Sequence, residues 1–182
     1  MKNLIAGVDE VGRGCLAGPV IAAAVILKKN ITGLDDSKKL SKIKRDNLNK
    51  LILQNSYFAY GIVSPTEIDE VNIHNASLLA MKRAILNLSI KPSKVLVDGL
   101  YLPDIKFDKN AIIGGDSLVE EISAASIIAK VYRDNLMLNL DKKYPHYGLA
   151  KHKGYPTKLH KEMLAKHGAT KIHRMSFKGV KQ

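Results

Sequence analysis

Residues 4–10 have the sequence LIAGVDE, a short apolar run that ends in two acidic residues, Asp9 and Glu10. An apolar run of this length followed by turn-forming residues is typical of a β-strand that is buried on both faces. Both carboxylates therefore stand where a strand would leave the core. The segment predicts a strand of a sheet, with chemistry at its end.

Two further acidic residues share this setting. Asp98 follows the apolar run 95–97, and Asp116 follows the run 111–115. Carboxylates that meet at strand ends repel one another, and they are costly to keep ionised unless a cation joins them. A hard divalent ion such as Mg²⁺ is the natural occupant of an all-oxygen cluster. We therefore expect a metal site built from Asp9, Glu10, Asp98 and Asp116.

Predicted strands and helices alternate along the chain. Strands are expected at about 4–9, 18–27, 57–63, 95–98 and 110–114. Helices are expected at about 41–54, 65–88, 118–142 and 157–167, with Ser41 and Thr157 as the N-caps of the first and last. This order predicts an α/β fold with a mixed sheet covered by helices. If the strands that carry Asp9 and Asp98 are parallel neighbours, both acids emerge at the same edge of the sheet.

The predicted helix 118–142 carries a patch of small residues at 123–126. This patch would let the helix backbone approach the sheet closely, near Asp116. Asp134 is a rival fourth acid for the metal site. It lies deep within the same helix beside Arg133, so we favour a salt bridge for it.

The formal net charge of +12 is unevenly spread over the 182 residues. Residues 141–182 hold 11 Lys and Arg against two acidic residues, and residues 28–54 hold eight against three. Such an excess on a small domain favours nucleic acid as the partner, because phosphate contacts release counterions. An anionic membrane is the weaker option, since no basic run is paired with a strongly apolar helical face.

Composition also bears on the compartment. Cys15 is the single cysteine, which excludes an internal disulfide and a cysteine-based zinc site and fits a reducing cytosol. We expect Cys15 to be a buried small residue rather than a nucleophile. The apolar stretch 20–27 has only 8 residues, far fewer than a membrane-spanning helix needs, and no segment resembles a signal peptide. A cytoplasmic protein without a membrane partner is expected.

The glycine-rich segment 7–18 has near matches to two phosphate-binding loops. Arg13 and Gly14 stand where a P-loop needs Lys and Ser or Thr, and the segment leads into a predicted strand where a dinucleotide motif would open a helix. Another use of the glycines fits better, because Gly12 and Gly14 let the backbone pass close to a ligand. Exposed N–H and C=O groups can recognise a 2′-hydroxyl, and Arg13 adds a fork for phosphate. An ordinary turn between hairpin strands is the competing interpretation.

The C-terminal quarter mixes tyrosines, lysines and histidines. Tyr144, Tyr147 and Tyr155 interleave with lysines, which suits stacking on a sugar or base, although a core or rim position is as frequent for any one of them. Five of the six histidines follow residue 145. Their irregular spacing gives no zinc-helix pair, and we interpret them mainly as polar, substrate-facing or solvated. No nucleophile-elbow pattern supports a serine–histidine–aspartate triad.

Ordered motifs along the chain resemble one family, the type 2 ribonucleases H, and specifically bacterial ribonuclease HII. The resemblance runs from about residue 5 to about residue 180. It rests on motifs at 9–14 (DEVGRG), 36–40 (DSKKL), 97–99 (VDG), 115–116 (GD), 123–131 (SAASIIAKV) with Arg133 and Asp134, 154–157 (GYxT) and 173–177 (HRxSF). The sister type, ribonuclease HIII, carries an extra N-terminal domain for which this chain has no room.

The resemblance implies a ribonuclease H-like fold, with a central mixed five-stranded sheet flanked by helices. It implies a single catalytic domain, 1–182, with a basic helical C-terminal extension over about 141–182. The implied activity is that of a metal-dependent endonuclease. It would hydrolyse the RNA strand of RNA–DNA hybrids and incise on the 5′ side of ribonucleotides embedded in duplex DNA, leaving 3′-hydroxyl and 5′-phosphate ends. Two ions, Mg²⁺ or Mn²⁺, are expected, and a monomer is expected.

The resemblance also assigns roles to individual residues. The catalytic metal ligands would be Asp9, Glu10, Asp98 and Asp116. Substrate binding would fall to Gly12, Arg13 and Gly14 at the ribose 2′-hydroxyl, to Tyr155 stacked on the following deoxyribose, and to Lys38 and Ser123.

The chain departs from the family pattern around Asp116. Gly114 and Leu118 stand there, where lysines are common in the family, so the local charge differs. A non-catalytic nucleic-acid-binding domain is the rival interpretation of the same basic surface. The clustered acids argue against it, because without metal they would repel phosphate.

Overall fold

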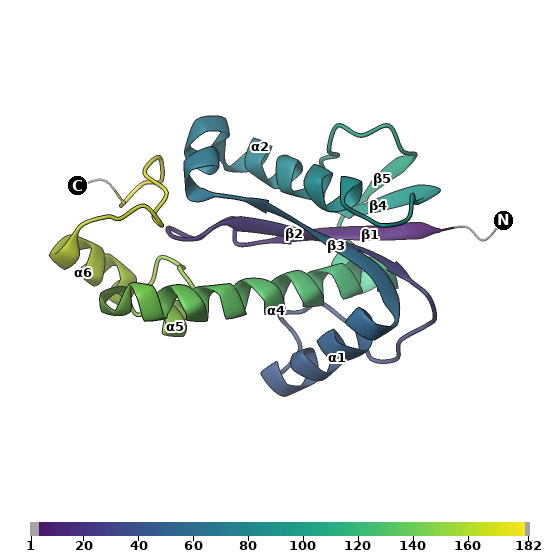
Figure 1. Ribbon diagram of the computed structural model, residues 1–182, viewed down its shortest axis with the longest axis horizontal. Helices are drawn as coiled ribbons and strands as arrows, with labels where there is room; N and C mark the ends of the chain where they lie inside the picture. Colours follow the sequence, from purple (N-terminus) through teal and green to yellow (C-terminus); the bar gives the residue numbers. More distant parts are fainter. Residues whose placement is uncertain (1–3, 181–182) are drawn as a thin grey trace.

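The computed structural model describes residues 4–180, which fold around a five-stranded sheet (Figure 1). The strands are β1 (Ile5–Val11), β2 (Val20–Leu27), β3 (Ser56–Val63), β4 (Lys94–Asp98) and β5 (Lys109–Ile112). They lie in the order β3-β2-β1-β4-β5. β1 is antiparallel to β2 and parallel to β4, β2 is antiparallel to β3, and β4 is parallel to β5. The expected mixed sheet is confirmed, and the strands that carry Asp9 and Asp98 are parallel neighbours.

Helices cover both faces of this sheet. They are α1 (Lys42–Gln54), α2 (Pro65–Leu86), α3 (Gly115–Leu118), α4 (Glu120–Lys143), α5 (Leu149–His152) and α6 (Lys158–His167), with a 3₁₀ turn η1 (Pro145–Tyr147). Figure 1 shows α2 on one face and α4 with α1 on the other, while α6 lies near the C-terminal end of α4. The side chains of Ser41 and Thr157 accept hydrogen bonds from backbone N–H groups of α1 and α6, so both predicted N-caps are confirmed.

Two predicted helices differ in detail from the structure. α2 is interrupted at Asn72, whose φ of 65° lies outside the helical range. The helix expected at 118–142 is divided, because Val119 is extended between α3 and α4. β5 ends at Ile112, so Asp116 lies in the first turn of α3 rather than directly behind a strand. Among residues 4–180, no helix is long and apolar enough to cross a membrane.

Side chains alternate between the two faces of the sheet along β2, so this strand contributes to two cores. Ala22 and Ala24 belong to the apolar cluster under α2, whereas Ala23 and Val25 belong to the cluster under α4 and α1. A third cluster contains Met137 of α4 together with apolar residues of the C-terminal helices. The C-terminal segment is therefore packed on the end of α4.

β1 and α4 approach each other closely at Gly7. A Cβ atom placed on Gly7 would lie 2.1 Å from the backbone carbonyl carbon of Glu121, so any larger residue would push the helix away. The small residues 123–126 that follow are all buried. The predicted close approach of this helix to the sheet is confirmed. Asp9 follows Gly7 on the same face of β1 and therefore also faces α4.

Candidate metal centre and substrate loop

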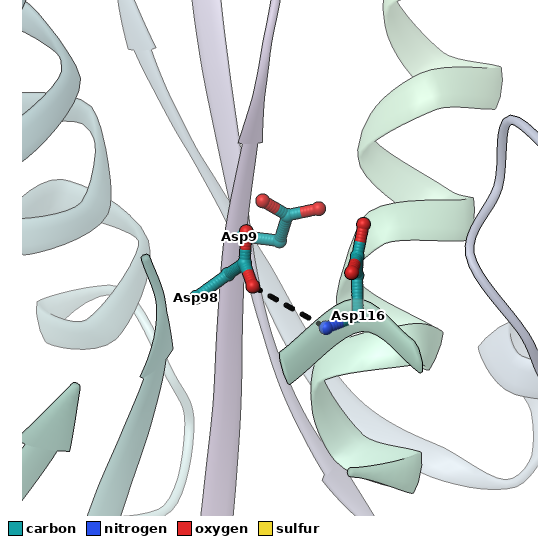
Figure 2. A group of neighbouring side chains, drawn as sticks. All are labelled: Asp9, Asp98 and Asp116. Atoms are coloured by element: carbon teal, nitrogen blue, oxygen red, sulfur yellow. Dashed lines mark hydrogen bonds between the residues drawn. The ribbon is translucent and has the colours of Figure 1, made fainter. Parts of the chain in front are cut away.

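Three carboxylates from separate segments of the chain meet at the carboxyl ends of β1 and β4 (Figure 2). Asp9, Asp98 and Asp116 each offer one oxygen, and these oxygens all lie within 4.8 Å of one another. Two of the three residues are shielded from solvent, since Asp9 is 6% exposed and Asp116 is 8% exposed, while Asp98 is partly exposed. The convergence expected from the three apolar runs is therefore present for these acids.

The pairing of the sheet and a short helix bring the three acids together. Because β1 and β4 run in parallel, Asp9 and Asp98 emerge at the same end of neighbouring strands. Asp116 reaches them from the first turn of α3, and its backbone N–H donates to Asp98 Oδ1 at 3.3 Å (Figure 2). This hydrogen bond fixes the orientation of the Asp98 carboxylate.

Serines of α4 support the cluster from the protein interior. The hydroxyl of Ser123 donates to the backbone carbonyl of Asp116 at 2.6 Å, which anchors α3 on α4. The hydroxyl of Ser126 helps to lower the pKa of the Asp9 carboxyl, and its oxygen lies 2.9 Å from that of Ser37. Ser123, expected among the substrate-binding residues, is thus placed behind Asp116 with only 4% of its surface exposed.

Burial and mutual repulsion raise the pKa values of these carboxyl groups. The pKa of Asp9 lies well above its ordinary value, mainly through desolvation, and then through the charges of Glu10 and Asp98. The pKa of Asp116 is raised first by burial and then by Asp98. A cation bound among the acids would reverse both effects, because it replaces the lost solvation and offsets the repulsion. A divalent ion with oxygen ligands fits this arrangement.

Glu10 and Lys38 lie beside the cluster. Glu10 projects from the face of β1 opposite to Asp9, and its carboxylate lies 3.6 Å from the guanidinium of Arg13. Burial raises the pKa of Glu10, and Arg13 opposes this shift. The ammonium of Lys38 lies 3.7 Å from Asp116, although the Lys38 side chain is 77% exposed. Glu10 is therefore the predicted metal ligand that the structure leaves outside the group of three.

Asp134, the rival fourth acid, is also outside that group. Its carboxylate lies 2.9 Å from the ammonium of Lys130, one turn earlier in α4. The predicted salt bridge is confirmed, but its partner is Lys130 rather than the neighbouring Arg133.

Two buried arginines hold the loop between β1 and β2, and both are 0% exposed. The side chain of Arg133, on α4, donates at 2.9–3.0 Å to the carbonyl oxygens of Ala17, Pro19 and Lys153. The side chain of Arg174 donates at 2.7–3.0 Å to the carbonyl oxygens of Gly12, Arg13 and Gly18. Neither arginine was expected in this role from the sequence. The available signal for Arg133 was its helical spacing, since Ala129 and Met137 lie one turn before and one turn after it.

The loop itself leads into β2 rather than a helix, which excludes the dinucleotide alternative. Gly12 has a φ of 95°, and a Cβ atom placed there would lie 2.3 Å from Nε of Arg133, so glycine is required on both grounds. At Gly14 the same construction meets nothing within 4 Å, so this part of the loop faces open space. Cys15 is fully buried, as expected.

Tyr155 lies at the surface next to this loop. It is 38% exposed, and Lys130 Nζ stands 6.0 Å from its ring centroid. The backbone N–H of Leu16 donates to the carbonyl of Gly154 at 2.8 Å, which joins the loop to the segment that carries the tyrosine. The ring expected to stack on a sugar is therefore accessible and rigidly linked to the glycine loop.

The histidines of the C-terminal segment include a buried cluster, so their expected substrate-facing or solvated position is wrong for three of them. His152, His160 and His173 are 8%, 0% and 2% exposed. The rings of His152 and His160 stack with centroids 4.4 Å apart, and Nε2 of His160 lies 3.3 Å from Nε2 of His173. Tyr147 is buried against the ring of His173. Their spacing is irregular because they come from different short helices and turns.

A model of the ribonuclease HII family matches residues 6–180 of the chain. The chain belongs to the ribonuclease HII family. It is 58% identical over 181 residues to ribonuclease HII of Borrelia hermsii, a match that covers 97% of this chain and 100% of that relative. It is 56% identical over 179 residues to ribonuclease HII of Borrelia recurrentis, covering 96% of this chain and 99% of that relative.

Solved structures of the ribonuclease HII type share the fold. The crystal structure of ribonuclease H2 from Pyrococcus horikoshii superposes with a TM-score of 0.81 at 29% identity, covering 97% of this chain and 94% of that one. Ribonuclease HII in its complex with PCNA from Archaeoglobus fulgidus gives a TM-score of 0.80 at 28% identity, covering 96% and 95%. The predicted family and the predicted ribonuclease H-like fold are confirmed. The chain is a hydrolase of the endonuclease class.

Proposed function

We propose that Asp9, Asp98 and Asp116, with Glu10 beside them, hold divalent metal ions for phosphodiester hydrolysis. As a member of the ribonuclease HII family, the chain cleaves the RNA of RNA–DNA hybrids and cleaves at ribonucleotides embedded in DNA. The finer proposal is that incision falls on the 5′ side of the ribonucleotide. It would leave 3′-hydroxyl and 5′-phosphate ends, with Mg²⁺ or Mn²⁺ as the ion.

The close approach of three carboxylates in a shielded place is the observation that carries this proposal. The donors are carboxylate oxygens, without histidine or cysteine, and this set suits Mg²⁺ or Mn²⁺. Two ions bound there would lower the pKa of the attacking water and stabilise the leaving 3′-oxygen. The chain's own part is to hold the carboxylates still, through the N–H of Asp116 on Asp98 and the N–H of Glu10 on Asp9.

Substrate selection is proposed to depend on Gly12, Arg13 and Gly14 together with Tyr155. The loop is exposed at Arg13 and Gly14, and the tyrosine ring is accessible beside it. Backbone donors and acceptors can bind a ribose 2′-hydroxyl, and an aromatic ring can stack on the next sugar. Lys38, largely exposed beside Asp116, is proposed to approach the phosphate.

We further propose that residues 1–182 form one catalytic domain. Residues 141–182 would act as its basic helical extension, and the enzyme would work as a cytoplasmic monomer. The packing of the C-terminal helices against Met137 supports one domain, because it gives the extension and α4 a common core. The lysines of this segment would add affinity for nucleic acid that falls with salt.

Cleavage of a defined duplex tests the function directly. A labelled DNA duplex with one ribonucleotide should be cut only when Mg²⁺ or Mn²⁺ is present, and the product ends should place the incision on the 5′ side of that ribonucleotide. The all-DNA duplex should stay intact, because a site built to bond a hydroxyl rejects its absence by ~10⁴-fold or more. Binding without any metal-dependent cleavage would favour the non-catalytic nucleic-acid-binding domain instead.

The role of Tyr155 is tested on the same substrate. Tyr155→Ala should lower cleavage of the single-ribonucleotide duplex by the loss of a stacking contact worth roughly 1–3 kcal/mol. The metal dependence should stay unchanged, because the carboxylates are intact. A variant with wild-type activity would remove Tyr155 from substrate binding.

A further inference from the structure

Arg174 donates four hydrogen bonds to three carbonyl oxygens of the loop between β1 and β2. The oxygens of Gly12 and Arg13 lie 2.7 and 2.8 Å from its terminal nitrogens, and the oxygen of Gly18 lies 2.9 and 3.0 Å from two of its nitrogens. The guanidinium comes from the far end of the chain and is fully buried. It therefore turns two consecutive carbonyls of the loop, those of Gly12 and Arg13, toward the protein interior.

The direction of these carbonyls fixes the direction of two N–H groups. In a trans peptide unit the C=O and N–H bonds point in opposite directions, and residues 4–180 contain no cis peptide bond. The carbonyl of Gly12 shares its peptide unit with the N–H of Arg13, and the carbonyl of Arg13 shares its unit with the N–H of Gly14. Both N–H groups therefore point away from Arg174.

These two N–H groups are free to bind a ligand. Within residues 4–180, neither the N–H of Arg13 nor that of Gly14 has a hydrogen-bond acceptor, and both residues are exposed. A Cβ atom placed on Gly14 would meet nothing within 4 Å, so space for a ligand adjoins the loop there. Two neighbouring backbone donors at an open position suit an oxygen-rich ligand.

We propose that Arg174 is a positioning residue for substrate recognition. By holding the carbonyls of Gly12 and Arg13 inward, it presents the N–H groups of Arg13 and Gly14 to the ribonucleotide, at its 2′-oxygen or the adjacent phosphate. This inference rests on the proposed function of the loop and adds the group that orients it. The buried positive charge also lies behind the two donors, where it favours an electron-rich ligand.

An arginine is needed for this role because of its shape. The planar guanidinium carries five N–H donors in a fixed fork, so it can hold three carbonyls at once, whereas a lysine ammonium acts as a single point. The segment that carries Arg174 is itself fixed. The Arg174 N–H donates to the carbonyl of Leu16 at 2.9 Å, and Asp69 of α2 accepts from the N–H groups of Met175 and Ser176 at 2.8 and 2.9 Å.

Arg174→Lys tests the proposal against a matched control, Arg133→Lys. Both substitutions keep a buried positive charge and lose a guanidinium fork, but Arg133 holds Ala17, Pro19 and Lys153 rather than the carbonyls of Gly12 and Arg13. Arg174→Lys should raise KM for the single-ribonucleotide duplex about tenfold more than Arg133→Lys does, the size expected for one or two misplaced hydrogen bonds. The kcat values of the two variants should be similar. Equal KM values in two folded variants would overturn the positioning role.

A measurement on the wild-type protein keeps the proposal testable if a variant fails to fold. In metal-free solution, the backbone amide NMR signals of Arg13 and Gly14 should shift more on addition of the single-ribonucleotide duplex than of the all-DNA duplex. If neither duplex shifts the amide signals of Arg13 and Gly14, the two N–H groups are not the proposed donors, even if cleavage is normal. A wild-type enzyme that cuts neither duplex in Mg²⁺ or Mn²⁺ would defeat the proposed function instead, so the two failures are distinct.

Discussion

Charges of like sign lie close together in two places in the protein, and the two groups differ in what compensates them. At the carboxyl ends of β1 and β4, Asp9, Asp98 and Asp116 stand close together, and Lys38 reaches them only from the solvent side. Behind the β1–β2 loop, Arg133 and Arg174 are more deeply buried, and carbonyl oxygens surround both guanidiniums. Among residues 4–180, the acids accept some hydrogen bonds but have no buried cation beside them, whereas both arginines are compensated by acceptors from within the fold.

This difference distinguishes the acidic cluster, which suits a bound ligand, from the two arginines, which support the loop from inside the fold. Burial raises the pKa of Asp9, so its charged form is disfavoured until a cation arrives. Burial lowers the pKa of Arg174 to about 10, which still leaves the guanidinium charged at neutral pH. Backbone dipoles thus stabilise the positive pair within the fold. The negative group has no buried counter-charge among residues 4–180, which is why we propose that it holds the metal ions.

Asp9→Asn removes one carboxylate of the negative group and should have the largest effect of the substitutions considered, a loss of cleavage activity. Loss of a supporting residue around a metal site typically lowers affinity or activity 10–100-fold, so loss of a direct ligand should lower cleavage by more than about 100-fold. Nucleic-acid binding should remain, because the basic surface is intact. Cleavage rates and fluorescence anisotropy measure the two properties. Asp104→Asn removes the same charge at a residue whose side chain is 97% exposed, and it should leave cleavage unchanged.

Arg133→Met should break the positive pair and cost stability. It leaves three carbonyl oxygens without their donor, so the free energy of unfolding should fall by about 3 kcal/mol or more. Urea denaturation measures the change. Arg83→Met is the control, because Arg83 forms an ion pair that is about one-third exposed and should contribute at most about 1 kcal/mol. Similar losses in both variants would contradict the internal support.

Asp98→Asn should act in the opposite sense on the apo protein. It removes one repelling charge while keeping the side-chain oxygen that accepts from the N–H of Asp116. We expect the metal-free protein to gain about 1 kcal/mol of stability. Millimolar Mg²⁺ or Mn²⁺ should raise the melting temperature of the wild type, as any native-state ligand does, and should raise that of the variant less. A wild-type melting temperature indifferent to both ions would count against the metal site.

The buried histidines form a third group, which is uncharged in the folded protein. Desolvation, and then His160, lower the pKa of His173 to about 4, below its ordinary value near 6.5. The unfolded chain therefore binds the proton first, so this contribution to stability is complete above about pH 6.5 and is lost as the pH falls toward 4. As the pH falls from 7.5 to 5.5, protonation of this residue in the unfolded chain should lower the free energy of unfolding by about 1 kcal/mol. In His173→Gln, the free energy of unfolding should therefore change less between pH 7.5 and 5.5 than in the wild type. The same pH dependence in both proteins would contradict this prediction.

The sequence predicted the parts of the site that depend on strands. The apolar runs before Asp9 and Asp98 marked strand ends, and parallel pairing then brought both acids together. Asp116 was placed near them, but its helix α3 was missed, because the glycines before it gave no helical period. Glu10 was expected within the cluster, although strand alternation turns it to the other face of β1.

The parts that depend on distant contacts were missed. Nothing near Arg174 in the sequence indicates that its partners are Gly12 and Arg13, since the hydrogen bonds span more than 160 positions. The buried histidines were mistaken for a polar surface for a similar reason. His160 and His173 come from separate segments, and a periodic pattern records only neighbours on one helix or strand.

The hydrogen bonds from Arg174 have a consequence for folding during synthesis. They join residues 161 and 162 positions apart, and a chain leaves the ribosome from its N-terminus. The β1–β2 loop must therefore wait for nearly the whole polypeptide before its carbonyls acquire their donor. The three clustered carboxylates are all synthesised by residue 116. A nascent chain thus contains all three carboxylates of the proposed metal site well before it contains the donor that orients the loop of the proposed substrate site.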